Sequence, residues 1–183
     1  MKVDISYPKI GKETVKIKTE YSDLWNMPQT FAYIILPILK KYRALYNKKN
    51  SHVGYPMIFI DDWKKIECMT EEQEKELIKR WTDILDKMIY SFTAVLSNHG
   101  WDGPLFQVML AEVDATLKPH KKRLKQLQKQ EHDKENYESD EWSLRMELSA
   151  PVYEKYHPLL EEHAKKVDEG LMLFAQYYKH LCL

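Results

Sequence analysis

Positive charge gathers in one stretch of the chain that carries no acidic side chain. Between residues 24 and 60 there are five lysine or arginine residues and one histidine, but no aspartate or glutamate. Such cations bind phosphate groups through charge-assisted hydrogen bonds, and nearby aromatic rings offer flat faces on which a base can stack. The stretch therefore predicts a surface for an anionic ligand of nucleotide type. Its cations are Lys40, Lys41, Arg43, Lys48, Lys49 and His52.

These cations also have a purely structural interpretation, because acids elsewhere in the chain can balance them. Asp83, Asp86 and the glutamates near the C-terminus are candidates to pair with the cations across the core. In that case, changing Arg43 or Lys41 to alanine strands a buried carboxylate and destabilises the protein. If the cations bind phosphate, the same change weakens ligand binding and leaves the stability of the free protein nearly unchanged. The sequence leaves both interpretations open.

A second group of polar residues follows one face of a helix expected after residue 70. Arg80, Asp83, Lys87 and Tyr90 recur at intervals of three, four and three residues, which places them on one side of an α-helix. This pattern is most typical of a solvated face with local ion pairs. It also offers a cation and a ring to a ligand, so we include Lys87 and Tyr90 among the candidate binding residues.

The sequence offers no arrangement of residues for catalysis. It lacks the phosphate loop GxxxxGK[ST], the dinucleotide fingerprint GxGxxG, the nucleophile motif GxSxG and the zinc motif HExxH. Its seven histidines are scattered, and Cys68 and Cys182 stand far apart without a CxxC pair. Neither a zinc site nor a disulfide framework is predicted. We therefore expect a protein that is not an enzyme and that holds neither a metal nor another cofactor.

Composition indicates one globular, cytoplasmic domain. The 183 residues are 44% apolar and carry 28 basic and 28 acidic side chains, so the chain can build a core and is formally neutral. A protein that binds duplex DNA usually has a large basic excess, so that class is not expected. There is no signal-peptide segment, and no apolar run approaches the ~20 residues that span a membrane.

The start of the chain favours extended structure. Apolar and polar residues alternate at 3–7 and at 15–17, with a proline, a glycine and lysines between the two runs. This pattern predicts a small β-hairpin with one buried face within residues 1–20. A lone hairpin is marginally stable in water, so it is expected to lie against helices or to pair with another copy of the chain.

Residues 21–100 are expected to supply core helices. Asn26 and Pro28 predict the start of the first helix, because asparagine caps orphan N–H groups and proline suits the first turn. An apolar stripe of helical period follows, and Pro37 inside it predicts a kink. Thr70, with a glutamine three residues later, is a capping box that predicts the start of the second helix. The short apolar run at residues 57–60 is expected to be extended.

The rest of the chain divides into a charged segment and a last helix. Residues 118–140 are basic in the first half and acidic in the second, which is typical of a solvated helix and a mobile linker. Replacing residues 126–137 with a short Gly/Ser stretch is then expected to leave folding and binding intact. Residues 151–183 are expected to hold a helix that starts at Pro158. These elements predict a mainly α, single domain (residues 1–183) of three to four long helices with a small N-terminal β-hairpin.

Four blocks of the sequence resemble, in order, blocks of a widespread family of small bacteriophage proteins. The first match pairs YSDLWNMPQTFAYIILPILKKYR with the family's DTW…TLA-x-I-I-L-P-x-L-K block, and the second pairs HVGYP with its K-H-G-x-P turn. The others pair WTDILDKMIYSF with W-x-x-V-L-D-E-M-I-W-A-F, and EGLMLFAQYYKHL with N-G-F-R-L-F-G-K-Y-Y-x-x-L-W. The segment 101–151 has no counterpart, and the chain departs from the pattern at Pro28, Lys87 and Cys182.

The resemblance implies a non-structural accessory protein in the cytoplasm of an infected bacterium. Phages carry small oligomeric proteins that sequester the cyclic nucleotides of bacterial immunity, and the resemblance implies such a homo-oligomeric sponge for a cyclic oligonucleotide. One alternative is an adaptor or inhibitor that binds a host enzyme, and another is a phosphodiesterase acting on the same ligands. The expected ligand-binding residues are Trp25, Lys40, Lys41, Arg43, His52, Tyr55, Lys87 and Tyr90.

Overall fold

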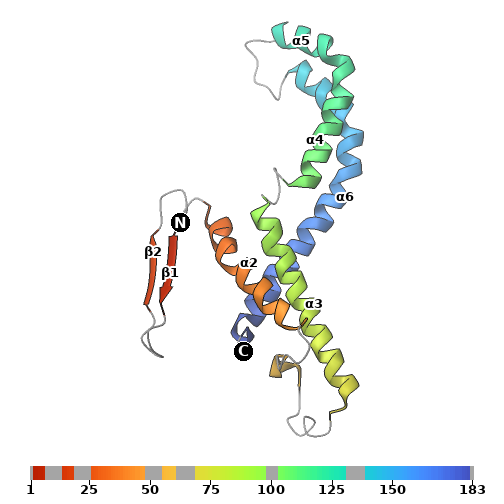
Figure 1. Cartoon of the computed structure of the whole chain (residues 1–183). Helices are drawn as coiled ribbons and strands as arrows, with labels where there is room; N and C mark the ends of the chain where they lie inside the picture. Colours follow the sequence, from red (N-terminus) through yellow and green to blue (C-terminus); the bar gives the residue numbers. More distant parts are fainter. Residues whose placement is uncertain are drawn as a thin grey trace. The chain divides into compact units, whose positions relative to one another are not determined.

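The computed structural model describes residues 2–6, 14–18, 26–47, 55–60, 69–97, 103–130 and 139–181 (Figure 1). Within these residues the protein is mainly helical, which confirms the predicted fold class at that level. The strands are β1 (Lys2–Ser6) and β2 (Thr14–Lys18), and the α-helices are α2 (Met27–Leu45), α3 (Glu71–Leu96), α4 (Pro104–Leu117), α5 (Lys121–Gln130) and α6 (Asp140–Tyr177). Single 3-10 turns are η1 (Met57–Phe59), η3 (Lys118–His120) and η5 (Tyr178–His180).

Strands β1 and β2 form an antiparallel two-stranded ribbon. Val3 lies opposite Ile17, and Ile5 lies opposite Val15. Both strands fall within residues 1–20. The side chains of the ribbon and the turn between its strands lie outside the described residues, so the predicted buried face stays a prediction.

The chain divides into two compact units, which we describe separately. Unit 1 comprises residues 1–96 and 167–183, and unit 2 comprises residues 97–166. Helix α6 contributes to both, because it continues from unit 2 into unit 1 at Val167. The expectation of one domain over residues 1–183 stays a prediction.

The core of unit 1 lies between α2, α3 and the end of α6. Trp81 of α3 is completely buried, and its ring meets the rings of Tyr42, Phe59 and Tyr177 edge to face at centroid distances of 6.5, 6.1 and 5.8 Å. Each such contact adds about 0.5–1.5 kcal/mol beyond the burial of apolar area. The stripe predicted for α3 supplies its buried core residues. Helix α2, in contrast, buries Ala32 and Leu36 beside its predicted stripe and leaves Phe31 and Ile38 of that stripe exposed. The remaining buried residues of the two helices are Ala32, Leu36, Leu39, Leu85, Met88 and Phe92.

Helix α6 approaches α3 closely at Gly170. A Cβ atom at this position would overlap the hydroxyl oxygen of Ser91 and the carbonyl oxygen of Lys87. Ser91 is buried and donates a hydrogen bond to that carbonyl at 3.1 Å. Glycine is therefore required here by the packing of the two helices.

In unit 2, α4 packs against the first part of α6, and α5 adds one buried residue, Leu124. A polar cluster joins the same two helices. The Lys155 ammonium donates to both carboxylate oxygens of Glu112, at 2.8 and 2.7 Å, and the Tyr156 hydroxyl donates to one of them at 2.8 Å. The other buried core residues are Met109, Val113, Leu117, Val152 and Tyr156.

Several predicted helix starts are confirmed. The Thr70 N–H donates to the Gln73 side-chain oxygen at 3.0 Å, and the Gln73 N–H donates to the Thr70 hydroxyl at 3.3 Å, which completes the capping box. Pro28 occupies the first turn of α2, as predicted, and Pro104 occupies the first turn of α4. Asn26 is the N-cap of α2, but its side chain makes no capping hydrogen bond.

Two local predictions are wrong. The last helix does not begin at Pro158, because Pro151 and Pro158 both lie inside α6. Both prolines are exposed, and the same stretch of α6 supplies Val152 and Tyr156 to the buried core of unit 2, so packing outweighs the backbone hydrogen bonds that the prolines remove. Residues 57–60 are not one extended segment, because η1 forms a 3-10 turn whose Phe59 packs on the core of unit 1.

Candidate functional site

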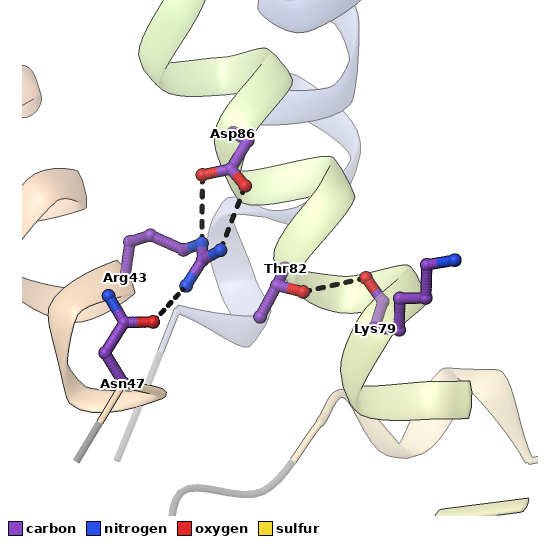
Figure 2. Close-up of polar contacts among 5 residues, drawn as sticks. All are labelled: Arg43, Asn47, Lys79, Thr82 and Asp86. Carbon is purple, nitrogen blue, oxygen red and sulfur yellow. Dashed lines mark hydrogen bonds and ion pairs between the residues drawn. The ribbon is translucent and has the colours of Figure 1, made fainter. Parts of the chain in front are cut away.

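The cation at the centre of the predicted site, Arg43, is bound within the protein. Its Nε donates to Oδ1 of Asp86 at 2.9 Å, and its Nη2 donates to Oδ2 at 3.0 Å. The remaining nitrogen, Nη1, donates to the side-chain oxygen of Asn47 at 3.1 Å. Figure 2 shows this fork reaching from α2 to the carboxylate on α3. Every nitrogen of the guanidinium group thus has an acceptor, and the structural interpretation of Arg43 is favoured over phosphate binding.

The pair is nevertheless not buried. The side chains of Arg43 and Asp86 are 23% and 53% exposed. Water therefore screens their attraction, and pairs of this kind contribute about 0–1 kcal/mol. The large destabilisation expected for a stranded buried carboxylate does not apply here.

The described lysines of the predicted site differ in whether they form an ion pair. The Lys87 ammonium lies 2.6 Å from a carboxylate oxygen of Glu169, with both side chains about half exposed. Lys40 and Lys41 are exposed on α2, and within the described residues neither forms an ion pair. Among the predicted cations that the structure describes, Lys40 and Lys41 are therefore the two whose positive charge is not paired, while Lys48, Lys49 and His52 lie outside the described residues.

The aromatic members of the predicted set that the structure describes are Tyr55 and Tyr90. Tyr55 packs against the core of unit 1, and its hydroxyl lies 3.2 Å from the sulfur of Met69. Burial, followed by the negative charge of Glu74, raises the pKa of Tyr55 above its usual value. Tyr90 is 42% exposed. Trp25 and His52 lie outside the described residues.

The two cations on the polar face of α3 have partners in other elements of unit 1. Arg80 lies over the ring of Phe59, with its guanidinium carbon 4.4 Å from the ring centroid. This cation–π contact and the Lys87–Glu169 pair occupy both cations of the face. The face is exposed, but the predicted local ion pairs are replaced by contacts with Phe59 of η1 and Glu169 of α6.

A groove suited to anions lies instead in unit 2, where η3 and α5 face the beginning of α6. It has a volume of about 450 Å³. Four cationic side chains and two carboxylates line it, which leaves a formal excess of two positive charges. The lining residues are Asp114, Leu117, Lys118, Lys121, Leu124, Lys125, Gln128, Glu141 and Arg145. We call this cavity the cationic groove.

Three lysines of the cationic groove follow one helical stripe. Lys118, Lys121 and Lys125 are separated by three and four residues, so their side chains share one face of η3 and α5. All three are exposed, whereas the two leucines that line the groove with them are buried. The groove therefore combines a hydrated row of ammonium groups with an apolar floor. That combination suits a ligand with both phosphates and a flat ring.

The two carboxylates of the groove differ in their contacts. Glu141 accepts hydrogen bonds from Arg145 at 2.6 and 3.1 Å, and its side chain is only 15% exposed. Asp114 is exposed in the last turn of α4, and its carboxylate has no hydrogen-bonding or ionic partner among the described residues. Asp114 thus keeps its acceptor positions available to a ligand.

Sequence reasoning treated the groove lysines as part of a solvated segment. The available signal was the 3/4 spacing of Lys118, Lys121 and Lys125 in a run without acids. The structure shows residues 118–130 as helix with Leu124 buried, which attaches this half of the segment to the core of unit 2. Residues 131–138 lie outside the described residues.

Comparisons of the chain with protein-family models, with curated proteins and with solved structures found no match. Within the described ranges, no group of three or more histidine, cysteine, aspartate or glutamate side chains is placed to hold a metal ion. None of the helices in this part of the chain is long and apolar enough to cross a membrane. Function must therefore be inferred from the chemistry of the site.

Proposed function

We propose that this is a phage-encoded, non-enzymatic binding protein that sequesters a nucleotide immune signal, a cyclic oligonucleotide, and so inhibits host antiphage defence. The observation that carries the proposal is the cationic groove of unit 2, with its row of lysines above an apolar floor. The resemblance of four sequence blocks to small phage proteins supplies the biological setting. Sequestration needs affinity alone, so no step of bond making or breaking is part of the proposal.

The groove has the chemistry that a nucleotide needs. Its volume of about 450 Å³ falls within the range of roughly 300–1,000 Å³ typical of small-ligand sites. Ammonium groups pair with phosphate oxygens, and a ligand that neutralises Lys118, Lys121 and Lys125 also relieves their mutual repulsion. Leu117 and Leu124 line the groove beside the lysines and make part of its lining apolar.

Calorimetry with cyclic dinucleotides and cyclic trinucleotides, followed by extraction and analysis of the bound ligand, tests this function. The variant Lys121→Ala/Lys125→Ala is expected to weaken binding by about tenfold or more, because each lysine supplies a charge-assisted hydrogen bond. A matched control is Lys122→Ala/Lys129→Ala, which removes the same charge from exposed positions of α5 that do not line the groove.

The outcomes separate the candidate functions. Ligand recovered intact, with affinity lost only in the groove variant, supports sequestration. Converted ligand would show an enzyme, such as a phosphodiesterase. No binding of any cyclic nucleotide would overturn the proposal.

A second candidate function, an adaptor or inhibitor of a host enzyme, rests on an apolar stripe of α2. Met27, Phe31 and Ile38 are 54%, 48% and 56% exposed at helical spacing. Phe31 lies edge to face with Phe174 of α6, at a centroid distance of 6.4 Å, so the apolar surface extends onto a second helix. Exposed apolar surface of this kind marks contacts between proteins.

The same stripe supports our proposal that the protein is a homo-oligomer. Light scattering at micromolar concentration is expected to show a species larger than the monomer, and Phe31→Glu is expected to shift it toward the monomer. A monomeric wild-type protein would show that the stripe does not join copies of the chain. That result would favour the second candidate, an adaptor that binds a host enzyme through the stripe.

A further inference from the structure

A free carboxylate in a cationic groove needs an explanation. Asp114 lies in the last turn of α4, where the helix dipole disfavours negative charge. It is spaced four residues before Lys118, yet the structure shows no ion pair between them, and its carboxylate has no other partner among the described residues. No ion pair or hydrogen bond therefore holds this carboxylate within the described part of the fold. A groove that bound only phosphate would bind it more tightly without Asp114, because the carboxylate repels the ligand.

Carboxylates accept hydrogen bonds and donate none when ionised. A ligand that benefits from Asp114 must therefore present N–H or O–H donors as well as phosphates. Guanine presents two parallel donors, N1–H and the N2 amino group, which match the two oxygens of a carboxylate. Adenine presents one donor beside the N1 lone pair, which would face a carboxylate oxygen and repel it. Cytosine has the same arrangement of one donor beside an acceptor.

We infer that the cationic groove selects guanine-containing nucleotides, with Asp114 accepting hydrogen bonds from N1–H and the N2 amino group while Lys118, Lys121 and Lys125 bind the phosphates. This inference rests on the proposed function, and it names the base of the sequestered ligand. A bidentate contact of this kind separates the right base from a wrong one by roughly tenfold to a hundredfold in affinity.

The test measures the affinity of the full-length protein by calorimetry for cyclic di-GMP, cyclic di-AMP, GMP, IMP, AMP and pyrophosphate. The wild-type protein is expected to prefer each guanine ligand over its adenine counterpart by about tenfold or more. IMP, which keeps N1–H but lacks the amino group, is expected to fall between GMP and AMP. The decisive variant is Asp114→Asn, and the control is Glu147→Gln, an exposed acid of α6 that does not line the groove.

Asp114→Asn replaces one acceptor by a donor, so the side chain then complements the N1 and N6 edge of adenine. The preference for guanine is expected to disappear or reverse, whereas pyrophosphate is expected to bind as tightly as before or more tightly. Glu147→Gln is expected to leave all ratios unchanged. Circular dichroism of both variants shows whether the fold is retained, and Asp114→Glu, which keeps the carboxylate, is expected to keep the preference.

Each other result overturns the inference in a distinct way. If Asp114→Asn weakens guanine and adenine nucleotides equally, the carboxylate contacts a ribose hydroxyl, and selection of the base is refuted while sequestration stands. If nucleotides bind the wild-type protein without base preference, the inference also fails alone. If neither nucleotides nor pyrophosphate bind, the proposed function and the inference fail together.

Discussion

Arg43 and Asp86 join α2 to α3 through two parallel hydrogen bonds of 2.9 and 3.0 Å, at a place where both side chains still contact water. The planar guanidinium group matches the carboxylate in a way that a lysine ammonium cannot. The contact balances the charge of Arg43 within the fold and links the two helices beside their apolar interface. It also explains why a stretch without acids does not need a ligand to balance this cation.

The first prediction concerns that pair. Arg43→Ala is expected to lower the free energy of unfolding by no more than about 1 kcal/mol, because the pair is partly solvated. Nucleotide affinity is expected to stay unchanged, since Arg43 does not line the cationic groove. Denaturant unfolding and calorimetry on Arg43→Ala measure both quantities, with Arg43→Lys as the variant that keeps charge but loses the fork. A tenfold loss of nucleotide affinity in Arg43→Ala would show that Arg43 belongs to the binding site.

A second prediction concerns Gly170. Gly170→Ala is expected to destabilise the protein by about 1–3 kcal/mol, although alanine is the better helix former, because the added methyl meets the backbone of α3. Met172→Ala is the control, since Met172 is 74% exposed on the same helix. Thermal and urea unfolding give the difference. A more stable Gly170→Ala variant would show that α6 can move away from α3 without loss.

The relation between sequence and structure differs from one element to another. The capping box at Thr70 could be predicted because it needs only residues three positions apart. Asp86 was named as a candidate partner of the cations, but no local pattern shows that it faces Arg43 across two helices. Spacing places the three lysines of the cationic groove on one helical face, but it cannot show the groove itself, because Arg145 reaches it from α6 and Leu124 is buried beneath it. The helix start predicted at Pro158 is wrong because Pro151 and Pro158 both lie inside α6, where packing in unit 2 outweighs the local signal of the prolines.

The third prediction concerns acid stability. The hydrogen bond from Lys155, and then that from the Tyr156 hydroxyl, hold the pKa of Glu112 below its ordinary value of 4.5. A carboxylate whose pKa is lower in the folded state stabilises the fold above its ordinary pKa, and that stabilisation is lost as the pH falls through the lowered pKa. The urea midpoint of the wild-type protein is therefore expected to fall as the pH drops below about 4.5.

Glu112→Gln isolates this contribution. The variant is expected to be less stable than the wild type at pH 7 and to approach it as the pH falls, because protonation removes the same charge from Glu112. Glu147→Gln, at an exposed position without these partners, is expected to keep a constant offset from the wild type. If the difference in stability between Glu112→Gln and the wild type stayed constant down to pH 3, ionisation of Glu112 would not be the cause of the acid sensitivity.

The last prediction reverses the expectation drawn from charge alone for the segment at 126–137. Replacing these residues with a Gly/Ser stretch removes Gln128, which lines the cationic groove, and the second half of α5. Helices this short depend on packing for their stability, so the remaining turn of α5 is expected to fray and to release Lys125 from its position. Nucleotide affinity should therefore fall by about tenfold, the contribution of roughly one charge-assisted contact. Replacing only residues 131–137 keeps α5 intact and is expected to preserve binding. Equal affinity in both replacement variants would show that α5 beyond residue 125 is unnecessary for the site.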